Sequence, residues 1–362
     1  MPTNSSNSNS SSDPTLTRRQ ILGAVGAAAG ALALANDARA GDKSSKKTSK
    51  TAAKCVVRVA AVSYAMPFHD HRTGINLSAL RDMTAKVAKE RPDFICYPEI
   101  CTCGGQGFEK GIEVAPELEP YVAEVGKIAR EFNTAIVAPF IERSEGKVYN
   151  SVPIVDRQGK FVLVYRKNYP TIHELERGIT PGTEVPVAEC DGVRVGAAVC
   201  FDANFDQIAA QLETGRARLV FWPSMYWGGE FLQHWSMRYG FAMAAAYGLE
   251  SSIIDMNGQY LSQQGQDTFQ VRRGNLPPWA IGDVHINREL YHLDYNQEHI
   301  TAIREKYSPD VEFEVHEPEG IFLMASHRAD LPVEEVASEF KLETMREYIT
   351  RSVKMRNDVL GV

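Results

Sequence analysis

The sequence predicts a layered α/β fold, because short apolar segments alternate with longer amphipathic ones along most of its 362 residues. Residues 56–65 are rich in alanine and β-branched side chains, as in a buried strand. Residues 76–91 instead place their apolar side chains on one helical stripe. A turn at residues 157–160 joins two further strand-like segments into a hairpin. Strands linked both by helices and by hairpins indicate sheets of mixed direction.

The other elements follow in the same alternation. Further strands are expected at residues 94–97, 135–141, 152–156, 161–166, 193–199, 219–222, 250–256 and 280–287. Helices are expected at residues 76–91, 116–133, 205–214 and 231–247. No internal repeat or second domain boundary is evident between residues 55 and 290, so we expect one domain there.

Both ends of the chain differ from this pattern. Paired arginines, Arg18-Arg19, precede a short run rich in alanine, glycine and leucine, and Ala38-Arg39-Ala40 closes it. This order is typical of a twin-arginine export signal, so we expect residues 1–40 to direct the protein to the periplasm or outside the cell. Residues 41–54 read as a basic, disordered linker. Residues 291–362 predict a helical extension with helices at 297–307 and 333–360.

Composition excludes some classes of function. The formal net charge of −7 gives no basic excess for nucleic acid, and no apolar run after the signal is long enough to cross a membrane. The spacing of the six cysteines resembles no disulfide scaffold, although an even number permits pairing. Cys101-Thr102-Cys103 lacks a second pair of ligands, so no metal is predicted. The cysteines are Cys55, Cys96, Cys101, Cys103, Cys190 and Cys200.

Three reactive side chains follow predicted strands, where functional groups of layered α/β proteins gather. They are the last residues of Tyr97-Pro98-Glu99 and Tyr165-Arg166-Lys167, and the cysteine of Val199-Cys200-Phe201-Asp202. Together with Trp222-Pro223-Ser224, these strings resemble the nitrilase superfamily of carbon–nitrogen hydrolases over about residues 56–287. The resemblance implies a four-layer αββα sandwich, a Glu-Lys-Cys triad and no cofactor.

The resemblance implies a role for each member of the triad. Cys200 is the expected nucleophile, exposed on a strand-to-helix turn, and Glu99 is the expected general base. Lys167 and the backbone N–H of Phe201 are expected to stabilise the oxyanion. The path is a thioester acyl-enzyme that water releases. Tyr226 and Trp227 follow a strand end and are candidates for the substrate pocket.

Some branches of the superfamily carry a second glutamate after the lysine. The spacing Lys-x-x-Pro-Thr-x-x-Glu favours Glu174, and Glu176 is the alternative. A cysteine protease would instead need a histidine base, for which His173, His234 and His285 are available. None of the three lies in a recognisable protease context, so this reading is not favoured.

The reaction within the superfamily is left open by the sequence. Cys200-Phe201-Asp202 resembles the amidase and N-carbamoyl hydrolase branches, whereas nitrilases proper tend to have Cys-Trp-Glu. We therefore expect a small-molecule amide or N-carbamoyl substrate, with nitrile hydrolysis and a catalytically silent binding protein as alternatives. Arg272-Arg273 could hold a substrate carboxylate or lie on a solvated surface. Family precedent implies a homodimer or higher homo-oligomer.

Overall fold

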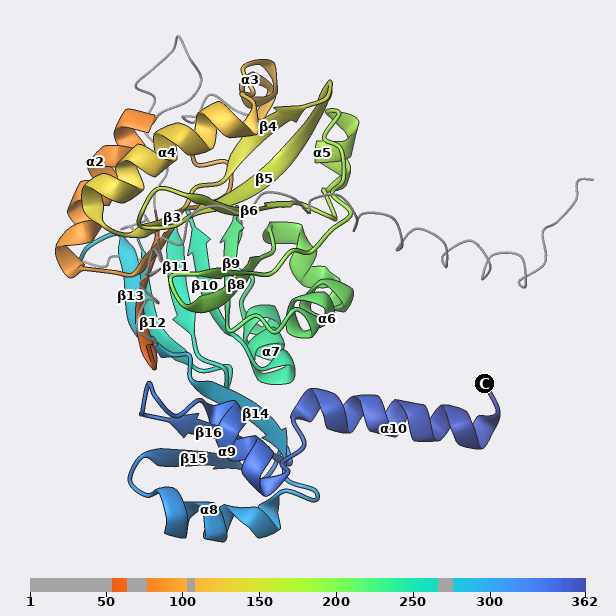
Figure 1. The fold of residues 1–362 in the computed structure, drawn as a ribbon. Coiled ribbons are helices and arrows are strands. Elements are labelled where there is room, and N and C mark those ends of the chain that lie inside the picture. The colour runs from red at the N-terminus through yellow and green to blue at the C-terminus, as the bar shows by residue number, and fades with distance from the viewer. Residues whose placement is uncertain (1–53, 64–76, 103–107, 266–275) are drawn as a thin grey trace, which may run out of the picture. The chain divides into compact units, whose positions relative to one another are not determined.

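The computed structural model describes residues 54–63, 77–102, 108–265 and 276–362. Several sequence predictions fall outside these ranges, namely the export signal, most of the linker, Cys103 and Arg272-Arg273. Within the described ranges, no helix has both the length and the apolar character needed to cross a membrane. The strands form two large sheets and one small one (Figure 1).

The first large sheet has seven strands of mixed direction, in the order β13-β1-β2-β3-β5-β4, with β6 paired to β5. β1 is parallel to β2 and β2 to β3, whereas β5 runs antiparallel to β3, β4 and β6. The predicted hairpin at residues 157–160 is the β5–β6 turn, where Gly159 has a φ of 74°. The strands are β1 (Val56–Val62), β2 (Phe94–Cys96), β3 (Ala135–Val137), β4 (Phe140–Ser144), β5 (Lys147–Val155), β6 (Phe161–Arg166) and β13 (Trp279–His285).

The second sheet has six strands in the order β12-β11-β10-β9-β8-β7. Its centre is parallel, because β8 pairs with β9 and β9 with β10 in the same direction, and its edges are antiparallel. The strands are β7 (Ala188–Cys190), β8 (Val193–Ala197), β9 (Leu219–Ser224), β10 (Ala242–Tyr247), β11 (Glu250–Ile254) and β12 (Tyr260–Gly265).

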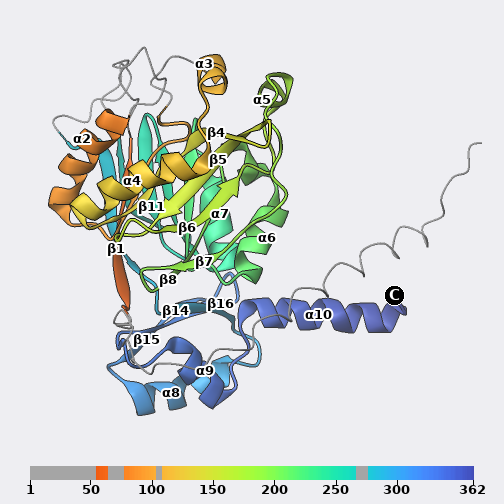
Figure 2. The same cartoon turned by 45° about the horizontal axis from the view of Figure 1, so that its top comes forward.

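The two sheets face one another, and helices cover their outer faces (Figures 1 and 2). The core between the sheets takes apolar residues from both, including Phe94 and Phe221, whose rings lie 5.6 Å apart. α2 (Leu77–Val87) and α4 (Leu118–Phe132) pack on the first sheet, and α6 (Asp206–Thr214) and α7 (Glu230–Tyr239) pack on the second. The predicted four-layer αββα sandwich is therefore confirmed.

Several predicted elements are wrong in their extent, and two examples lie in the sandwich. The helix expected at residues 231–247 is α7 followed by β10, because Gly240 ends α7 in the left-handed region and donates to Ser236. The alanines of β10 are buried on both faces of the strand, between the other sheet and the helices. The sequence of β10 therefore does not alternate between apolar and polar side chains, and nothing in it distinguished a strand from a helix. The strand expected at residues 135–141 is divided into β3 and β4, on either side of Pro139.

The C-terminal segment differs from the helical extension that the sequence predicted, because it also contains a three-stranded sheet. β16 (Ile321–Ser326) lies between β14 (Arg288–His292) and β15 (Val311–His316), and both neighbours are antiparallel to it. α8 (Ile300–Tyr307) and α9 (Val333–Phe340) pack on this sheet through their own apolar cluster. α10 (Met345–Leu360) has no buried residue and extends away from the sheet (Figures 1 and 2).

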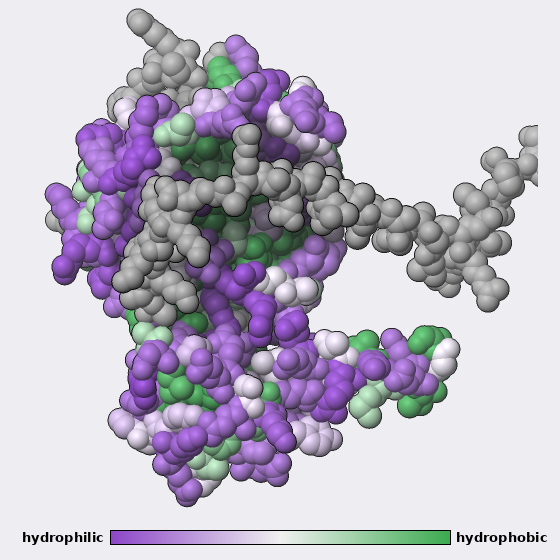
Figure 3. All heavy atoms as spheres, viewed as in Figure 1, coloured by the Kyte–Doolittle hydropathy of each residue, from purple (hydrophilic) through white to green (hydrophobic). Residues whose placement is uncertain are grey.

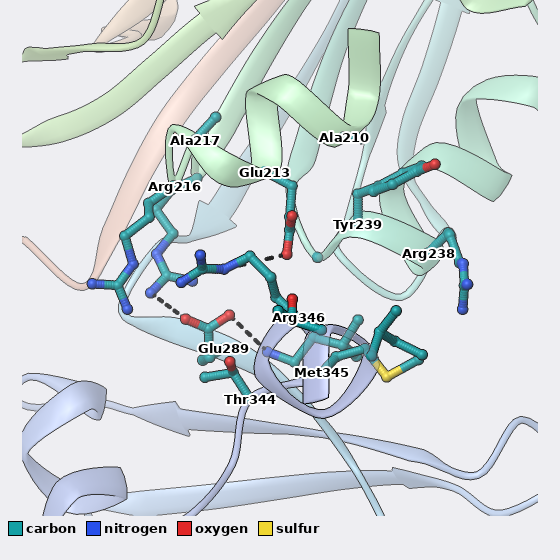
Figure 4. A pocket seen from close by; sticks show the side chains of 15 residues that line it. Ala210, Glu213, Arg216, Ala217, Arg238, Tyr239, Glu289, Thr344, Met345 and Arg346 are labelled. Atoms are coloured by element: carbon teal, nitrogen blue, oxygen red, sulfur yellow. Dashed lines mark hydrogen bonds and ion pairs between the residues drawn. The ribbon is translucent and has the colours of Figure 1, made fainter. Parts of the chain in front are cut away.

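Ion pairs link the C-terminal segment to the sandwich. Arg218, just before β9, donates to Glu289 of β14 at 2.8 Å and to Glu334 of α9 at 2.7 Å. Nearby, Glu213 at the end of α6 points toward Arg346 at the start of α10, with 3.5 Å between the charged atoms (Figure 4). A cavity of about 200 Å³ lies among these groups. Buried charges that bond in this way stabilise a structure only while every partner is present.

Replacing Arg218 therefore tests the attachment of the C-terminal segment. Arg218→Ala leaves Glu289 partly buried without its cation, so we expect unfolding to require about 3 kcal/mol less free energy. Urea unfolding followed by circular dichroism measures this change. Arg194→Ala is the matched control, since Arg194 is exposed and bonds only the carbonyl of Gly215. A loss for Arg218→Ala no larger than for the control would contradict the interpretation.

Candidate active site

The three predicted reactive side chains follow three strands from both sheets. Glu99 follows β2 and Lys167 follows β6 in the first sheet, whereas Cys200 follows β8 in the second. All three side chains are buried, although two of them carry charge. The structure brings Glu99 and Lys167 into direct contact and places Cys200 close enough to perturb the proton affinity of Lys167.

Lys167 lies at the centre of the cluster. Its Nζ donates to Glu99 Oε1 at 2.9 Å and to Glu174 Oε2 at 2.7 Å, and the side chain is 1% exposed. Burial disfavours the ammonium ion, but attraction to Glu99, Cys200 and Glu174 outweighs it, so the pKa of Lys167 is raised above its ordinary value. Lys167 is therefore a fixed positive charge at neutral pH.

The second glutamate beside the lysine is Glu174, and Glu176 is exposed on the same short helix, α5 (Ile172–Glu176). Thr171 caps α5 by accepting from the N–H of Glu174, while Glu174 Oε2 accepts from the N–H of Thr171 at 2.8 Å. Burial raises the pKa of Glu174, but Lys167, Asn150 and Thr171 together lower it below its ordinary value. Glu174 is thus an ionised, fully bonded partner of Lys167.

The two oxygens of Glu99 have different surroundings. Oε1 accepts from Lys167 and, at 2.7 Å, from Asn150 Nδ2. Oε2 is buried and has no hydrogen-bond partner among the residues that the structure describes. A buried carboxylate oxygen without a donor is well suited to accept a proton.

Cys200 begins a short 3₁₀ segment, Cys200–Asn204, directly after β8, and its φ of 49° is in the left-handed region. Such strain in a residue with a side chain is typical of functional turns. We expected an exposed sulfur, but Cys200 is only 7% exposed, because the turn packs against the ends of both sheets. Burial raises the pKa of the Cys200 thiol to about 12, and Glu99 adds to the rise. Lys167, the N–H of Met225 and the hydroxyl of Ser224 oppose it.

Asp202 holds the nucleophile turn in place. Its Oδ2 accepts from the hydroxyl of Tyr165 at 2.7 Å and from the N–H of Val199 at 2.8 Å, and its Oδ1 accepts from the N–H of Tyr169 at 2.9 Å. Burial raises the pKa of Asp202 to about 6, even though these bonds favour the charged form. Because Tyr165 and Tyr169 flank Lys167, Asp202 fixes the cysteine turn relative to the lysine loop.

The sequence also predicted roles for Phe201, Tyr226 and Trp227. The N–H of Phe201 makes no hydrogen bond within the described residues, as an oxyanion donor requires. The hydroxyl of Tyr226 donates to the carbonyl oxygen of Cys200 at 3.2 Å. Trp227 instead lies against Tyr247 and lines a separate cavity of about 230 Å³. Glu99, Lys167 and Cys200 do not line that cavity.

The alternative catalytic groups lie elsewhere. His173 and His234 are exposed, and His285 lies beside His327, with 5.1 Å between the ring centroids. Within the described ranges, none of these histidines hydrogen-bonds Cys200 or Glu99, and no group of three or more ligating side chains could hold a metal ion. Cys55, Cys96, Cys190 and Cys200 are free thiols.

Sequence reasoning missed three residues of the site, Asn150, Asp202 and Ser224. Asp202 and Ser224 belong to the short sequences that resemble the nitrilase superfamily, but no role was predicted for either residue. Asn150 is a buried amide in β5 and is followed by the buried Ser151, so two adjacent polar side chains in a mostly apolar strand are the signal that could have found it. It escaped notice because the strand was expected to begin at residue 152, five residues late.

Comparison with known proteins places the chain in a family. Residues 58–284 match the carbon-nitrogen hydrolase family, and the chain belongs to it. An (R)-stereoselective amidase from a Pseudomonas species is 29% identical over 42% of this chain and 54% of its own length. N-carbamoylputrescine amidase from Arabidopsis thaliana is 29% identical over 29% of this chain and 36% of its own length. The chain thus spans about half or less of these curated relatives.

Solved structures share the fold. An amidase from Nesterenkonia, assigned to the nitrilase superfamily, aligns over 69% of this chain and 97% of its own, with a TM-score of 0.52 and 18% identity. A nitrilase-superfamily protein of Saccharomyces cerevisiae aligns over 71% of this chain and 96% of its own, with a TM-score of 0.55 and 15% identity. The αββα sandwich is therefore the fold of that superfamily.

The raised pKa of Cys200 gives a direct test of the site's resting state. Since burial disfavours the thiolate, we expect Cys200 to remain protonated up to about pH 10, rather than forming a thiolate–lysine ion pair. Ultraviolet difference spectra of the protein against Cys200→Ser should show no thiolate absorbance up to about pH 9, although activated cysteines ionise at about pH 3.5–7.5. A thiolate step near neutral pH would show that Lys167 outweighs burial.

Proposed function

We propose that this protein hydrolyses a small-molecule amide or N-carbamoyl compound through a thioester on Cys200. The observation that carries this proposal is the buried, bonded cluster of Lys167, Glu99 and Glu174 beside the strained Cys200 turn. Each group has the charge or the free atom that acyl transfer needs: a thiol, an unpartnered carboxylate oxygen and a fixed cation. The names of the amidase and N-carbamoylputrescine amidase relatives support the same class of bond.

In the first half of the reaction, Glu99 Oε2 takes the proton of the Cys200 thiol as the sulfur bonds to the substrate carbonyl carbon. The carbonyl oxygen becomes an oxyanion, which Lys167 and the N–H of Phe201 stabilise. The carbon–nitrogen bond then breaks, and the nitrogen leaves with the proton from Glu99 as ammonia or an amine. A thioester remains on Cys200.

In the second half, Glu99 removes a proton from water while the water oxygen attacks the thioester carbon. The tetrahedral intermediate expels the Cys200 sulfur, which recovers its proton from Glu99 and leaves the substrate acid free. Glu174 stays ionised throughout, since Asn150, Thr171 and Lys167 all donate to it. Its role is to keep Lys167 charged and oriented.

The proton transfer suits a buried site because the net charge of the cluster does not change. One lysine, two glutamates and a thiol carry a total charge of −1 before the transfer. A thiolate, a protonated Glu99, the lysine and Glu174 carry the same total afterwards. Simple loss of the thiol proton to solvent would instead raise the buried negative charge, which low-dielectric surroundings oppose.

A substrate screen tests the proposed reaction. We expect ammonia release from one or more amides or N-carbamoyl amino acids, and none from Cys200→Ala. We expect Glu99→Gln to lower kcat by about 10²–10⁴-fold, the usual contribution of a general base. Release from nitriles alone would favour the nitrilase alternative. Failure of every class, with no acyl adduct on Cys200 by mass spectrometry, would favour a silent binding protein.

We further propose that the protein forms a homodimer in which α10 packs on a second copy of the chain. The first half of α10 contacts the chain through residues such as Met345 and Tyr348, but no residue of α10 is fully buried. Its second half extends without tertiary packing, and such a helix is marginal in water. Its free end exposes apolar side chains, with Val359 at 87% (Figure 3). α10 carries four basic and two acidic residues, whereas the whole chain has a net charge of −7. A second copy therefore offers both apolar cover and opposite charge.

Deleting residues 351–362 tests this interface. We expect light scattering to give twice the chain mass for the intact protein and one chain mass for the deletion. The unfolding midpoint of the sandwich should change little, because no deleted residue is buried within one chain and, among the described residues, Arg351 contacts only the C-terminal segment, at Glu343, Tyr295 and Tyr348. An unchanged mass for the deletion would exclude α10 as the interface.

Export remains a proposal that rests on the sequence of residues 1–40 alone. We propose that the twin-arginine signal carries the folded hydrolase to the periplasm or outside the cell. Folding before export would let Cys200 reach its buried position in a reducing compartment.

A further inference from the structure

One residue contacts every charged member of the cluster. Asn150 lies in β5 and is 1% exposed. Its Nδ2 donates to Glu99 Oε1 at 2.7 Å and to Glu174 Oε1 at 2.9 Å, and its backbone carbonyl accepts from the N–H of Lys167 at 2.8 Å. The same residue therefore fixes the lysine through its main chain and both carboxylates through its side chain.

We propose that Asn150 is a positioning residue that orients Glu99 for proton transfer. This inference rests on the proposed function of Glu99 as the general base. Asn150 and Lys167 together saturate Glu99 Oε1, so Oε2 is left as the oxygen that exchanges protons. Without Asn150, Lys167 would be the one described residue that still bonds the Glu99 carboxylate, which could then rotate about its terminal bond.

The amide also separates two like charges. Glu99 and Glu174 both bind Lys167, and two carboxylates that share one cation repel each other. A donor placed between them stabilises both in the charged form. Loss of that donor raises the pKa of the carboxylates, so the site would hold an extra proton to higher pH and Glu99 would be unable to act as a base there.

The orientation of the Asn150 amide follows from its neighbours. Its Oδ1 has no hydrogen-bond partner among the described residues, so no contact of that oxygen sets the orientation. The reverse orientation would turn the oxygen toward two carboxylates, which cannot donate to it when ionised. The amide therefore acts here as a donor, and an acid of the same shape cannot replace it without binding a proton.

A purely structural role for Asn150 predicts a different result. The bond between β5 and the lysine loop uses the Asn150 backbone carbonyl, which every substitution keeps. A side-chain substitution therefore removes the two bonds to the carboxylates and leaves the strand pairing in place. Lower stability is expected in either case, but only the positioning role changes the pH dependence of the Cys200 reaction.

The test measures the alkylation of Cys200 by iodoacetamide over a range of pH, by intact mass, on the full chain. This probe needs no knowledge of the substrate. We expect the acid limb of the alkylation rate to move up by about one pH unit in Asn150→Leu, which is about tenfold slower alkylation below the limb. Asn150→Asp, which adds a third carboxylate, should move the limb further in the same direction.

The matched control is Asn168→Ala. Asn168 is adjacent to Lys167, and its amide donates to the backbone carbonyls of Arg166 and Glu184 rather than to Glu99 or Glu174. We expect the acid limb of this variant to stay at the wild-type pH. An acid limb that also stays in place in Asn150→Leu, with a lower unfolding midpoint, would overturn the proposal and leave a structural role. If Asn150→Leu does not fold, Asn150→Asp decides by the same criterion.

Two further variants separate this inference from the proposed function. Glu99→Gln should abolish the acid limb, and Cys200→Ala should take up no label at the site. If Glu99→Gln keeps the limb, then Glu99 is not the base and both proposals fail. If Glu99→Gln removes the limb while Asn150→Leu leaves it unmoved, only the inference about Asn150 fails. A shifted limb together with no hydrolysis in the substrate screen would support the inference and count against the proposed reaction.

Discussion

The burial of Lys167 between two carboxylates is the constraint on which the site depends. A lone ammonium ion at this depth would lose its proton, and a lone pair of glutamates would hold one. Each charge is stable only because the others are present, so the cluster exists as a unit or not at all. The fold must therefore bring β2, β5, β6 and α5 close enough for their side chains to form hydrogen bonds. The seven-stranded sheet does this by placing its strands side by side.

The proposed nucleophile, Cys200, comes from the other sheet, and Asp202 connects the two sheets. It accepts from Val199 within the cysteine turn and from Tyr165 and Tyr169 around the lysine. Most side chains between the two sheets are apolar, and these resist separation but fix lateral position weakly, because dispersion contacts have little direction. Other polar contacts also join the sheets, among them Ser63 with Ser251 and Arg157 with Asp191. Three directional bonds to one buried carboxylate supply the alignment that apolar packing leaves loose.

The sequence was sufficient to predict the layered fold, which depends on local periodicity. Short strings led to Glu99, Lys167 and Cys200, which stay a predicted triad. It was less informative where the tertiary neighbours of a segment determine its structure. The alanines of β10 read as helix, since small side chains carry little pattern until the strand is seen buried on both faces. The strands after residue 287 were missed among charged residues, and Asn150 was missed because its partners are 51 and 24 positions away. Pairing at such distances leaves no mark in a local window.

The position of Cys200 has a consequence for the protein during its synthesis and folding. Its reactive partners come from residues 99, 167 and 174, so the nucleophile is assembled only after strands far apart in sequence have docked. In a nascent or partly unfolded chain, Cys200 is an ordinary thiol with no base beside it. The proposed catalyst is thus complete only when folding is finished, and an incomplete chain has the thiol without its base.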